Sequence, residues 1–183
     1  IEEILDKYPS SISAGQQQRA SLARALVRKA DLYLLDEPMG QLEPQLRSVL
    51  RVRLKQYLQE HQMTTVLVTH DQTEANALAD RIAVMEDGEL QQFESPTQLK
   101  HKPANIYVGT FIGEPPMNTF AAEVKPTGKG FQFQLEETGE ILDYQNVNFP
   151  HYLRDQLIKH RRILLGLRPH AVKLGEGALK AQV

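Results

Sequence analysis

The residues of this sequence that can do chemistry follow short apolar segments. Asp36 and Glu37 come directly after the apolar run 32–35, and His70 follows the apolar run 66–69. Neighbouring residues of a strand point to opposite faces, so the two carboxylates can take different tasks. One can hold a hydrated Mg²⁺, while the other orients and deprotonates an attacking water. The imidazole of His70 can donate to a phosphate oxygen.

A second chemical feature is the small-residue turn at Ser13, Ala14 and Gly15, which opens a helix. The free N–H groups and the positive dipole end of a helix attract anions. Ser13 offers a hydroxyl, and Gly15 allows a close backbone approach. Each feature also has a purely structural interpretation. The turn at residues 13–15 can be an ordinary helix cap, and residues 16–19 can be a solvated helical face. Asp36–Pro38 can merely close a strand.

The spacing of these features is more informative than any one of them. One helix and one strand separate Gly15 from Asp36, and a further helix and strand separate Glu37 from His70. In a parallel sheet, ligands collect at the carboxyl edge of the strands. We therefore expect residues 36 and 70 to lie on the same sheet edge, where a nucleotide triphosphate and its magnesium can bind.

Composition narrows the classes of protein that the chain can represent. The 183 residues are 41% hydrophobic and 24% charged, as in ordinary globular proteins, and the net charge is −2. That charge gives no electrostatic case for a nucleic-acid partner. The chain has no cysteine, which excludes disulfides and thiolate metal sites. It begins without Met, and both ends have the look of cuts in a longer sequence.

The apolar pattern predicts an α/β fold with a mostly parallel sheet. Helical spacing favours helices over 15–29 and from Pro44 onward, and the β-branched and apolar run at 64–69 suits a buried strand. The remaining elements expected in this part are the end of a helix at 2–8, a helix at 73–79, a strand at 81–85, a tight turn at Asp87-Gly88, a strand at 90–93, and helices from Ser95 and over 104–111.

The pattern of apolar residues changes near residue 113. Beyond the prolines at 115 and 116 the apolar segments are short and alternating, which is typical of a β-rich module. The elements expected there are strands at 121–124, 131–135 and 163–167, a turn at 126–130, and one helix at 152–160. We therefore divide the chain into domains at 1–112 and 113–183.

Three motifs give the first domain a specific resemblance. Residues 12–19 (Ile-Ser-Ala-Gly-Gln-Gln-Gln-Arg) resemble the signature motif of ABC transporter ATPases. Residues 32–38 resemble the Walker B strand of that family with its catalytic glutamate, and residues 69–72 (Thr-His-Asp-Gln) resemble its switch histidine. The resemblance implies that residues 1–112 are the C-terminal part of a P-loop NTPase domain that binds ATP and Mg²⁺.

The resemblance also implies a role for each matching residue. Asp36 would support Mg²⁺ through water, Glu37 would polarise the attacking water, and His70 would contact the γ-phosphate. Two subunits of this family close head-to-tail around two ATP molecules. The residues that would contact the ATP held by the other subunit are Ser13, Gly15 and Gln16.

The tail resembles a particular branch of the family. Residues 111–118 and 166–169 are similar to the junction and regulatory domain of importer ATPases for sugars, polyols and glycerol phosphate. That domain has an OB-like fold and helps to pair the subunits. In this sequence we expect it to stop before its end.

The sequence also departs from the family pattern. Ala14 replaces the usual first glycine of the signature, and in the D-loop Gly40 and Glu43 stand where serine and aspartate are usual. These changes suggest an unequal pair of ATPase subunits, although Glu43 can simply cap the helix that begins at Pro44. The Walker A loop and the Q-loop are absent, so we expect the isolated chain to be inactive.

The function that the resemblance implies is the ATP-hydrolysing subunit of a bacterial ABC importer for a sugar, polyol or glycerol-type solute. Its implied partners are a second ATPase subunit, the same or different, two membrane-spanning permease subunits and, indirectly, a solute-binding protein, with no nucleic acid. Its implied location is peripheral, on the cytoplasmic face of the inner membrane. Two alternatives stay open: an ABC-type ATPase of non-transport machinery, and an inactive fragment that serves only as a dimerisation or regulatory module.

Overall fold

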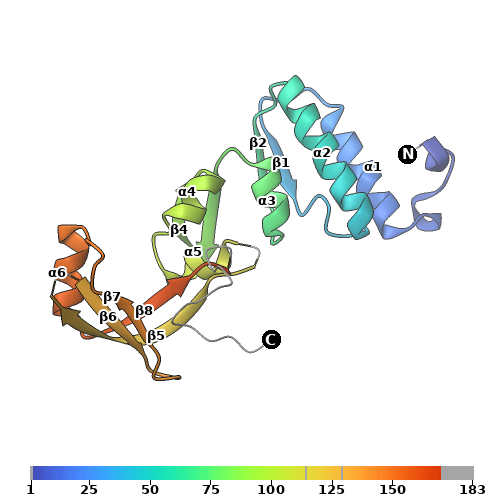
Figure 1. Cartoon of the computed structure of the whole chain (residues 1–183). Coiled ribbons are helices and arrows are strands. Elements are labelled where there is room, and N and C mark those ends of the chain that lie inside the picture. Colours follow the sequence, from blue (N-terminus) through green and yellow to red (C-terminus); the bar gives the residue numbers. More distant parts are fainter. Residues whose placement is uncertain (1, 114, 129, 170–183) are drawn as a thin grey trace. The chain divides into compact units, whose positions relative to one another are not determined.

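The computed structural model describes residues 2–113, 115–128 and 130–169 (Figure 1). Within it the chain forms two compact units. The first contains residues 1–83 and 93–96, and the second contains residues 84–92 and 97–183. Each unit is described by itself below.

The first unit is built on one pair of parallel strands. Its elements are 3₁₀ turns at Glu2–Ile4 and Pro9–Ser11, α1 (Ala14–Leu26), β1 (Tyr33–Asp36), α2 (Pro44–Glu60), β2 (Thr65–Val68) and α3 (Gln72–Leu78). Strands β1 and β2 pair in parallel, with Tyr33 opposite Thr65 and Asp36 opposite Val68. The predicted α/β class is therefore confirmed, and Pro44 begins its helix as expected.

One face of this parallel pair is packed and the other is bare. Met39, Leu42, Leu54 and Leu78 form a buried cluster, and Leu67 packs against it. On the opposite face Leu34 is 72% exposed, and Val66 and Val68 are 51% and 57% exposed. Parallel strands are normally covered on both faces, so this apolar surface is suited to contact with further structure.

A hairpin joins the two units along the chain. Strands β3 (Ile82–Glu86) and β4 (Glu89–Glu94) pair through the tight turn predicted at Asp87 and Gly88. Both turn residues have positive φ, 49° and 82°, which matches the twist of a two-residue hairpin. Two short helices follow, α4 (Pro96–His101) and α5 (Ile106–Phe111).

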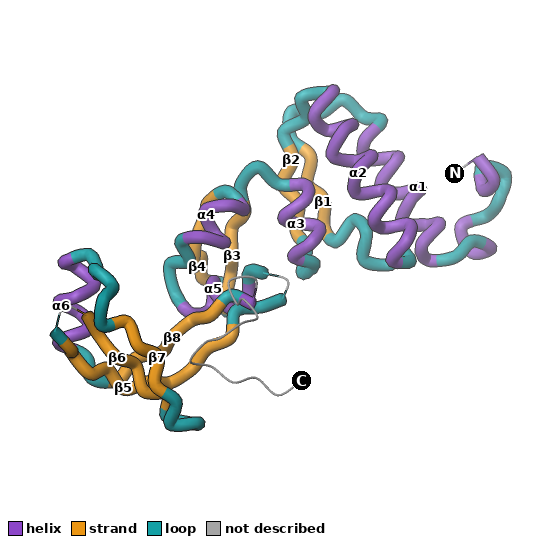
Figure 2. The backbone as a smooth tube through the Cα atoms, in the orientation of Figure 1, coloured by secondary structure: helices purple, strands orange, loops and turns teal. Residues whose placement is uncertain are grey.

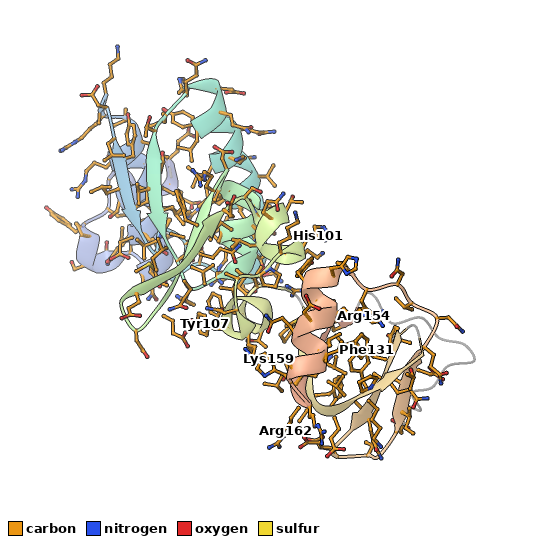
Figure 3. The ribbon with its side chains drawn as sticks, turned by 90° about the vertical axis from the view of Figure 1, so that its left-hand side faces the viewer. His101, Tyr107, Phe131, Arg154, Lys159 and Arg162 are labelled. Atoms are coloured by element: carbon orange, nitrogen blue, oxygen red, sulfur yellow. The ribbon has the colours of Figure 1, made fainter. Side chains whose placement is uncertain are left out.

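The second unit contains an antiparallel sheet of four strands in the order β7-β6-β5-β8 (Figure 2). Its elements are β5 (Asn118–Thr127), β6 (Gly130–Leu135), β7 (Ile141–Tyr144), α6 (His151–Lys159) and β8 (Arg162–Leu167). Phe131, Phe133 and Leu157 belong to its core. In Figure 3 helix α6 lies beside Phe131, and the guanidinium carbon of Arg154 is 5.9 Å from the centre of that ring. This is the β-rich module that the sequence predicted.

Several elements differ from the sequence-based expectation. The first residues form short 3₁₀ turns rather than the end of an α-helix. Strand β7 was not predicted, and Pro126 lies in β5 rather than in the turn. Pro126 is opposite Phe131 of β6, but the pairing of β5 with β8 covers only residues 118–123. The strand therefore tolerates a residue without an N–H where one side is unpaired.

The domain boundary near residue 113 remains a prediction. Residues 170–183, at the end of the second predicted domain, lie outside the described residues. Among the helices described, none is both long and apolar enough to span a bilayer.

Replacing Phe131 by alanine is expected to lower the free energy of unfolding of the β-rich module by about 3–5 kcal/mol. Phe131 is 1% exposed and meets Phe149 edge-on at 5.4 Å, so the change removes ring contacts and leaves a cavity. Denaturant unfolding followed by near-UV circular dichroism measures the loss. Tyr152→Ala, at a site 74% exposed, is the control. Equal effects of the two changes would contradict this packing.

Candidate functional site

The predicted catalytic residues lie at one edge of the parallel pair. Asp36 is opposite Val68 in the strand register, so Glu37 and His70 both follow at the carboxyl end. The N–H of Glu37 donates to the carbonyl of Val68 at 2.9 Å, which continues the ladder one residue beyond β1. The expectation that residues 36 and 70 share a sheet edge is confirmed.

Glu37 and His70 meet directly through their side chains. Nδ1 of His70 lies 2.5 Å from Oε1 of Glu37, which makes this a short, charge-assisted contact. The hydrogen bond to Glu37, and then the negative charge of Glu37, raise the pKa of His70 above its usual value. If Nδ1 donates to the carboxylate, a neutral ring has only an acceptor at Nε2. The protonated ring, which Glu37 favours, donates from both nitrogens.

The backbone of Glu37 adopts an uncommon conformation. Its φ is +45°, a left-handed value that costs most non-glycine residues about 1–3 kcal/mol. Three hydrogen bonds hold it there. Besides the N–H bond to Val68, the carbonyl of Glu37 accepts from the N–H of Gly40 at 3.2 Å and from Nε2 of Gln18 at 2.7 Å. Backbone bonding on both sides of the residue therefore offsets its strain.

Gln18 was not singled out from the sequence, where residues 16–19 were open to interpretation as a solvated face. Its amide spans the loop after β1, since Nε2 donates to Glu37 and Oε1 accepts from the N–H of Gln41 at 2.8 Å. Gly15, one turn earlier on the same face of α1, also faces this loop. A Cβ on Gly15 would lie 3.0 Å from the carbonyl oxygen of Gln41. The signal in the sequence was the i, i+3 spacing of Gly15 and Gln18.

Ser13 and Gln16 are engaged with each other. The hydroxyl of Ser13 accepts from the N–H of Gln16 at 3.2 Å, and the N–H of Ser13 donates to Oε1 of Gln16 at 3.0 Å. This capping box defines the start of α1. Within the described ranges, the hydroxyl proton of Ser13 and the amide nitrogen of Gln16 remain as donors without a hydrogen-bond partner. The predicted ATP contacts of both residues stay predictions.

Asp36 fits the demands of magnesium. Its side chain is exposed and makes no hydrogen bond or ion pair within the described part of the chain. Mg²⁺ keeps several waters and commonly takes one or two carboxylates together with substrate phosphates. No group of three or more His, Cys, Asp or Glu in the described ranges can hold a metal. A magnesium ion at Asp36 would therefore need water and phosphate as its other ligands.

The loop after β1 is held from α2 as well. Arg47 donates to the carbonyls of Gly40 at 3.4 Å and Leu42 at 3.2 Å, and its NH1 lies 3.2 Å from Oδ2 of Asp71. Asp71 in turn caps α3 by accepting from the N–H groups of residues 73 and 74. Arg47 thus ties the segment that follows Glu37 to the segment that follows His70.

The D-loop residues that depart from the family pattern have defined surroundings. Glu43 occupies the N-cap position of α2, but its side chain makes no capping hydrogen bond. The helix dipole still favours a negative charge at that position. A Cβ on Gly40 would lie 3.2 Å from Oε2 of Glu37. A side chain at residue 40 would therefore crowd the carboxylate that contacts His70.

A buried carboxylate, Glu74, lies in the helix that follows His70. Glu74 is 2% exposed, and the hydroxyl of Thr69 donates to its Oε2 at 2.8 Å. Its Oε1 has no hydrogen-bond partner among the described residues. Burial is the main cause that raises the pKa of Glu74 above its usual value. This group supports the segment around His70 at a cost in desolvation.

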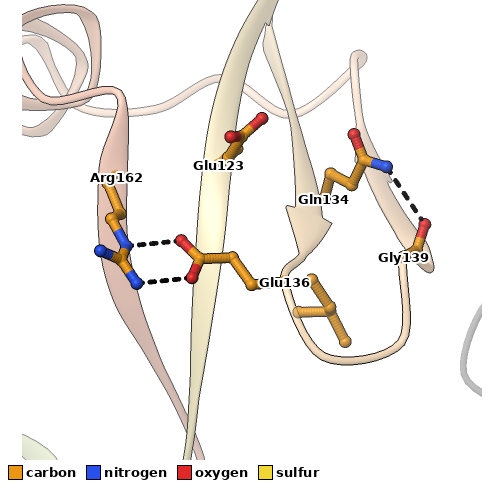
Figure 4. A pocket seen from close by; sticks show the side chains of 6 residues that line it. Glu123, Gln134, Glu136, Gly139 and Arg162 are labelled. Atoms are coloured by element: carbon orange, nitrogen blue, oxygen red, sulfur yellow. Dashed lines mark hydrogen bonds and ion pairs between the residues drawn. The ribbon is translucent and has the colours of Figure 1, made fainter.

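The second unit has a separate polar hollow of about 520 Å³ (Figure 4). Arg162 donates to both carboxylate oxygens of Glu136 at 2.6 Å, and this bond raises the pKa of Arg162. Glu123 and Gln134 also line the hollow. Among the residues that line the hollow, the one cation, Arg162, is already paired with the carboxylate of Glu136. The chemistry of the described residues is concentrated at Glu37 and His70.

Comparison with known proteins bears on the family of the chain. The family model described as "ABC transporter" matches residues 1–40. The xylose/arabinose import ATP-binding protein XacK of Haloferax volcanii is 41% identical over 179 residues, which are 96% of this chain and 43% of that protein. The trehalose/maltose import ATP-binding protein MalK of Thermococcus litoralis is 47% identical over 128 residues, covering 70% of this chain and 34% of that protein.

One further relative and one solved structure are also similar to this chain. The sn-glycerol-3-phosphate import ATP-binding protein UgpC of Vibrio vulnificus is 46% identical over 125 residues, 68% of this chain and 34% of that protein. A solved dimeric, post-hydrolysis structure of the ATP-binding cassette MJ0796 with ADP and Pi is 34% identical, with a TM-score of 0.48 over 52% of this chain and 40% of that one. The chain spans less than half the length of these relatives.

Replacing Glu74 by glutamine is expected to change how stability depends on pH. The folded pKa of Glu74 is raised, so its stabilising contribution is complete below the unfolded pKa near 4.5 and is lost as the pH rises through the folded value. The stability of Glu74→Gln relative to the natural protein should therefore increase from about pH 4.5 upward. Urea unfolding of both proteins between acid and neutral pH measures this difference. Glu60→Gln, at an exposed position of α2, is the control. If the free energy of unfolding of Glu74→Gln differed from that of the natural protein by the same amount at every pH, a buried, desolvated carboxylate would be contradicted.

Proposed function

Since this chain is a homologue of ABC transporter ATP-binding subunits, we propose that it is part of the ATP-hydrolysing subunit of an importer. The observation that carries the proposal is the contact between Glu37 and His70 at the carboxyl edge of β1 and β2, where β1 ends in the exposed Asp36. The transported solute proposed is a sugar, polyol or glycerol-type compound. The names of the relatives, which import xylose/arabinose, trehalose/maltose and glycerol 3-phosphate, support that class.

In this proposal each residue at the sheet edge has one task. Asp36 would hold Mg²⁺ through water, and the ion would supply positive charge beside the phosphates of bound ATP. Glu37 accepts a proton from the attacking water. His70, whose side chain is exposed and keeps Nδ1 against Glu37, would donate from Nε2 to a γ-phosphate oxygen. The raised pKa of His70 favours the protonated ring that this donation needs.

The proposed working subunit contains more than the residues of this chain. The bare apolar face at Leu34, Val66 and Val68 supports this, because a parallel pair that is buried on only one face is incomplete. We propose that this face is covered by the part of the subunit that carries the phosphate-binding loop. Without that loop, Glu37 is a base with no positioned substrate.

The proposed assembly pairs this subunit with a second ATPase subunit, two permease subunits and, indirectly, a solute-binding protein. Ser13, Gly15 and Gln16 at the start of α1 would face the ATP of the second subunit. The subunit would lie on the cytoplasmic face of the membrane, in line with the importer names of its relatives. The second subunit can be the same chain or a different one, and Gly40 and Glu43 favour a different one.

The second candidate function is a regulatory or dimerisation module. The separate aromatic core of the second unit supports it, since residues 118–167 bury their own apolar residues. This candidate does not explain the pairing of Glu37 and His70 in the first unit. It is therefore secondary to the ATPase proposal.

The chain by itself is expected neither to bind Mg-ATP tightly nor to hydrolyse it. Phosphoryl transfer depends almost entirely on positioning and charge stabilisation, and this sequence contains no Gly-rich phosphate loop. Isothermal titration with Mg-ATP and a phosphate-release assay measure both properties. Micromolar binding together with turnover would overturn this expectation.

In the full-length subunit, Glu37→Gln is expected to lower hydrolysis by about 10²–10⁴-fold while ATP binding persists, because the shape of the site survives and the base does not. Phosphate release and nucleotide binding are measured on the same preparation. Glu60→Gln serves as the control, since Glu60 lies at the exposed end of α2. Loss of ATP affinity with Glu37→Gln would assign Glu37 a structural or metal-binding role instead.

A further inference from the structure

Helix α1 contacts the segment that carries Glu37 through one side chain that was not recognised from the sequence. The amide of Gln18 donates to the carbonyl of Glu37 at 2.7 Å and accepts from the N–H of Gln41 at 2.8 Å. It therefore closes the loop between residues 37 and 41 with two hydrogen bonds of good length.

These bonds are placed where the backbone is under strain. Glu37 has a φ of +45°, so relaxing to the ordinary right-handed region would swing its side chain away from its present direction. The Gln18 bond to its carbonyl opposes that rotation. The same rotation would break the 2.5 Å contact between Glu37 and Nδ1 of His70.

We infer that Gln18 is a positioning residue for the proton-accepting carboxylate of Glu37, an inference that rests on the proposed function. Both of these hydrogen bonds of the Gln18 amide go to peptide groups and not to the carboxylate or to His70. It acts through the peptide groups of Glu37 and Gln41. Because Gly15 meets the carbonyl of Gln41 from the same face of α1, movement of the helix start would be transmitted to Glu37 along this contact.

The test compares two substitutions of Gln18 in the full-length subunit. Gln18→Met has a similar length and loses both hydrogen bonds. Gln18→Glu keeps an acceptor for Gln41 but places an oxygen against the carbonyl of Glu37. Both are expected to lower kcat about 10- to 100-fold, as small misplacements of reacting groups do, with the KM for ATP within about twofold. Gln59→Met, at an exposed position of α2, is expected to leave both parameters unchanged.

A double-mutant cycle separates positioning from general loss of structure. If Gln18 acts through Glu37, Gln18→Met has no further effect on the residual single-turnover rate of Glu37→Gln. An equal fractional loss in both backgrounds would overturn the inference, as would an unchanged kcat for Gln18→Met in an active subunit.

Amide hydrogen exchange of this chain measures the contact between Gln18 and the N–H of Gln41, and it needs no ATPase activity. The N–H of Gln41 is expected to exchange faster in Gln18→Met and to keep its protection in Gln18→Glu. Unchanged exchange in Gln18→Met would show that the contact is not formed. Absence of hydrolysis by the unmodified full-length subunit would instead refute the proposed function, while the exchange result would still report on the contact.

Discussion

The candidate site depends on the backbone of one residue, Glu37. Its left-handed conformation is unfavourable in isolation and persists because both of its peptide groups are bonded, to β2 through Val68 and to the loop and α1 through Gly40 and Gln18. This geometry directs the carboxylate toward His70. Strain of this kind is common where a side chain must be held ready for a reaction. The parallel pairing of β1 and β2 fixes the carbonyl of Val68, which accepts from the N–H of Glu37.

Much of this arrangement could be predicted from sequence because it follows from local rules. The apolar runs that precede Glu37 and His70 indicate buried strands, and the spacing between them leaves room for one helix. Parallel pairing then brings the two residues to one edge. Pro44 and Asp71 mark helix starts through backbone preferences that operate in any context.

The parts that could not be predicted depend on contacts between distant segments. Nothing in the identity of Glu37 signals a positive φ, since glycine is the residue usually found there. The role of Gln18 depends on which face of α1 meets the loop, and periodicity alone left that open. Strand β7 has only four residues, and Pro126 reads as a turn until its unpaired side in β5 is known.

The central claim is that Glu37 and His70 form one hydrolytic pair held at the end of β1 and β2. A crystal structure of the full-length subunit with Mg²⁺ and a non-hydrolysable ATP analogue tests it most directly. The account predicts a water between the Glu37 carboxylate and the γ-phosphate, with Nε2 of His70 in hydrogen-bond contact with a γ-phosphate oxygen. A Glu37 with negative φ and a carboxylate turned away from both groups would contradict the account.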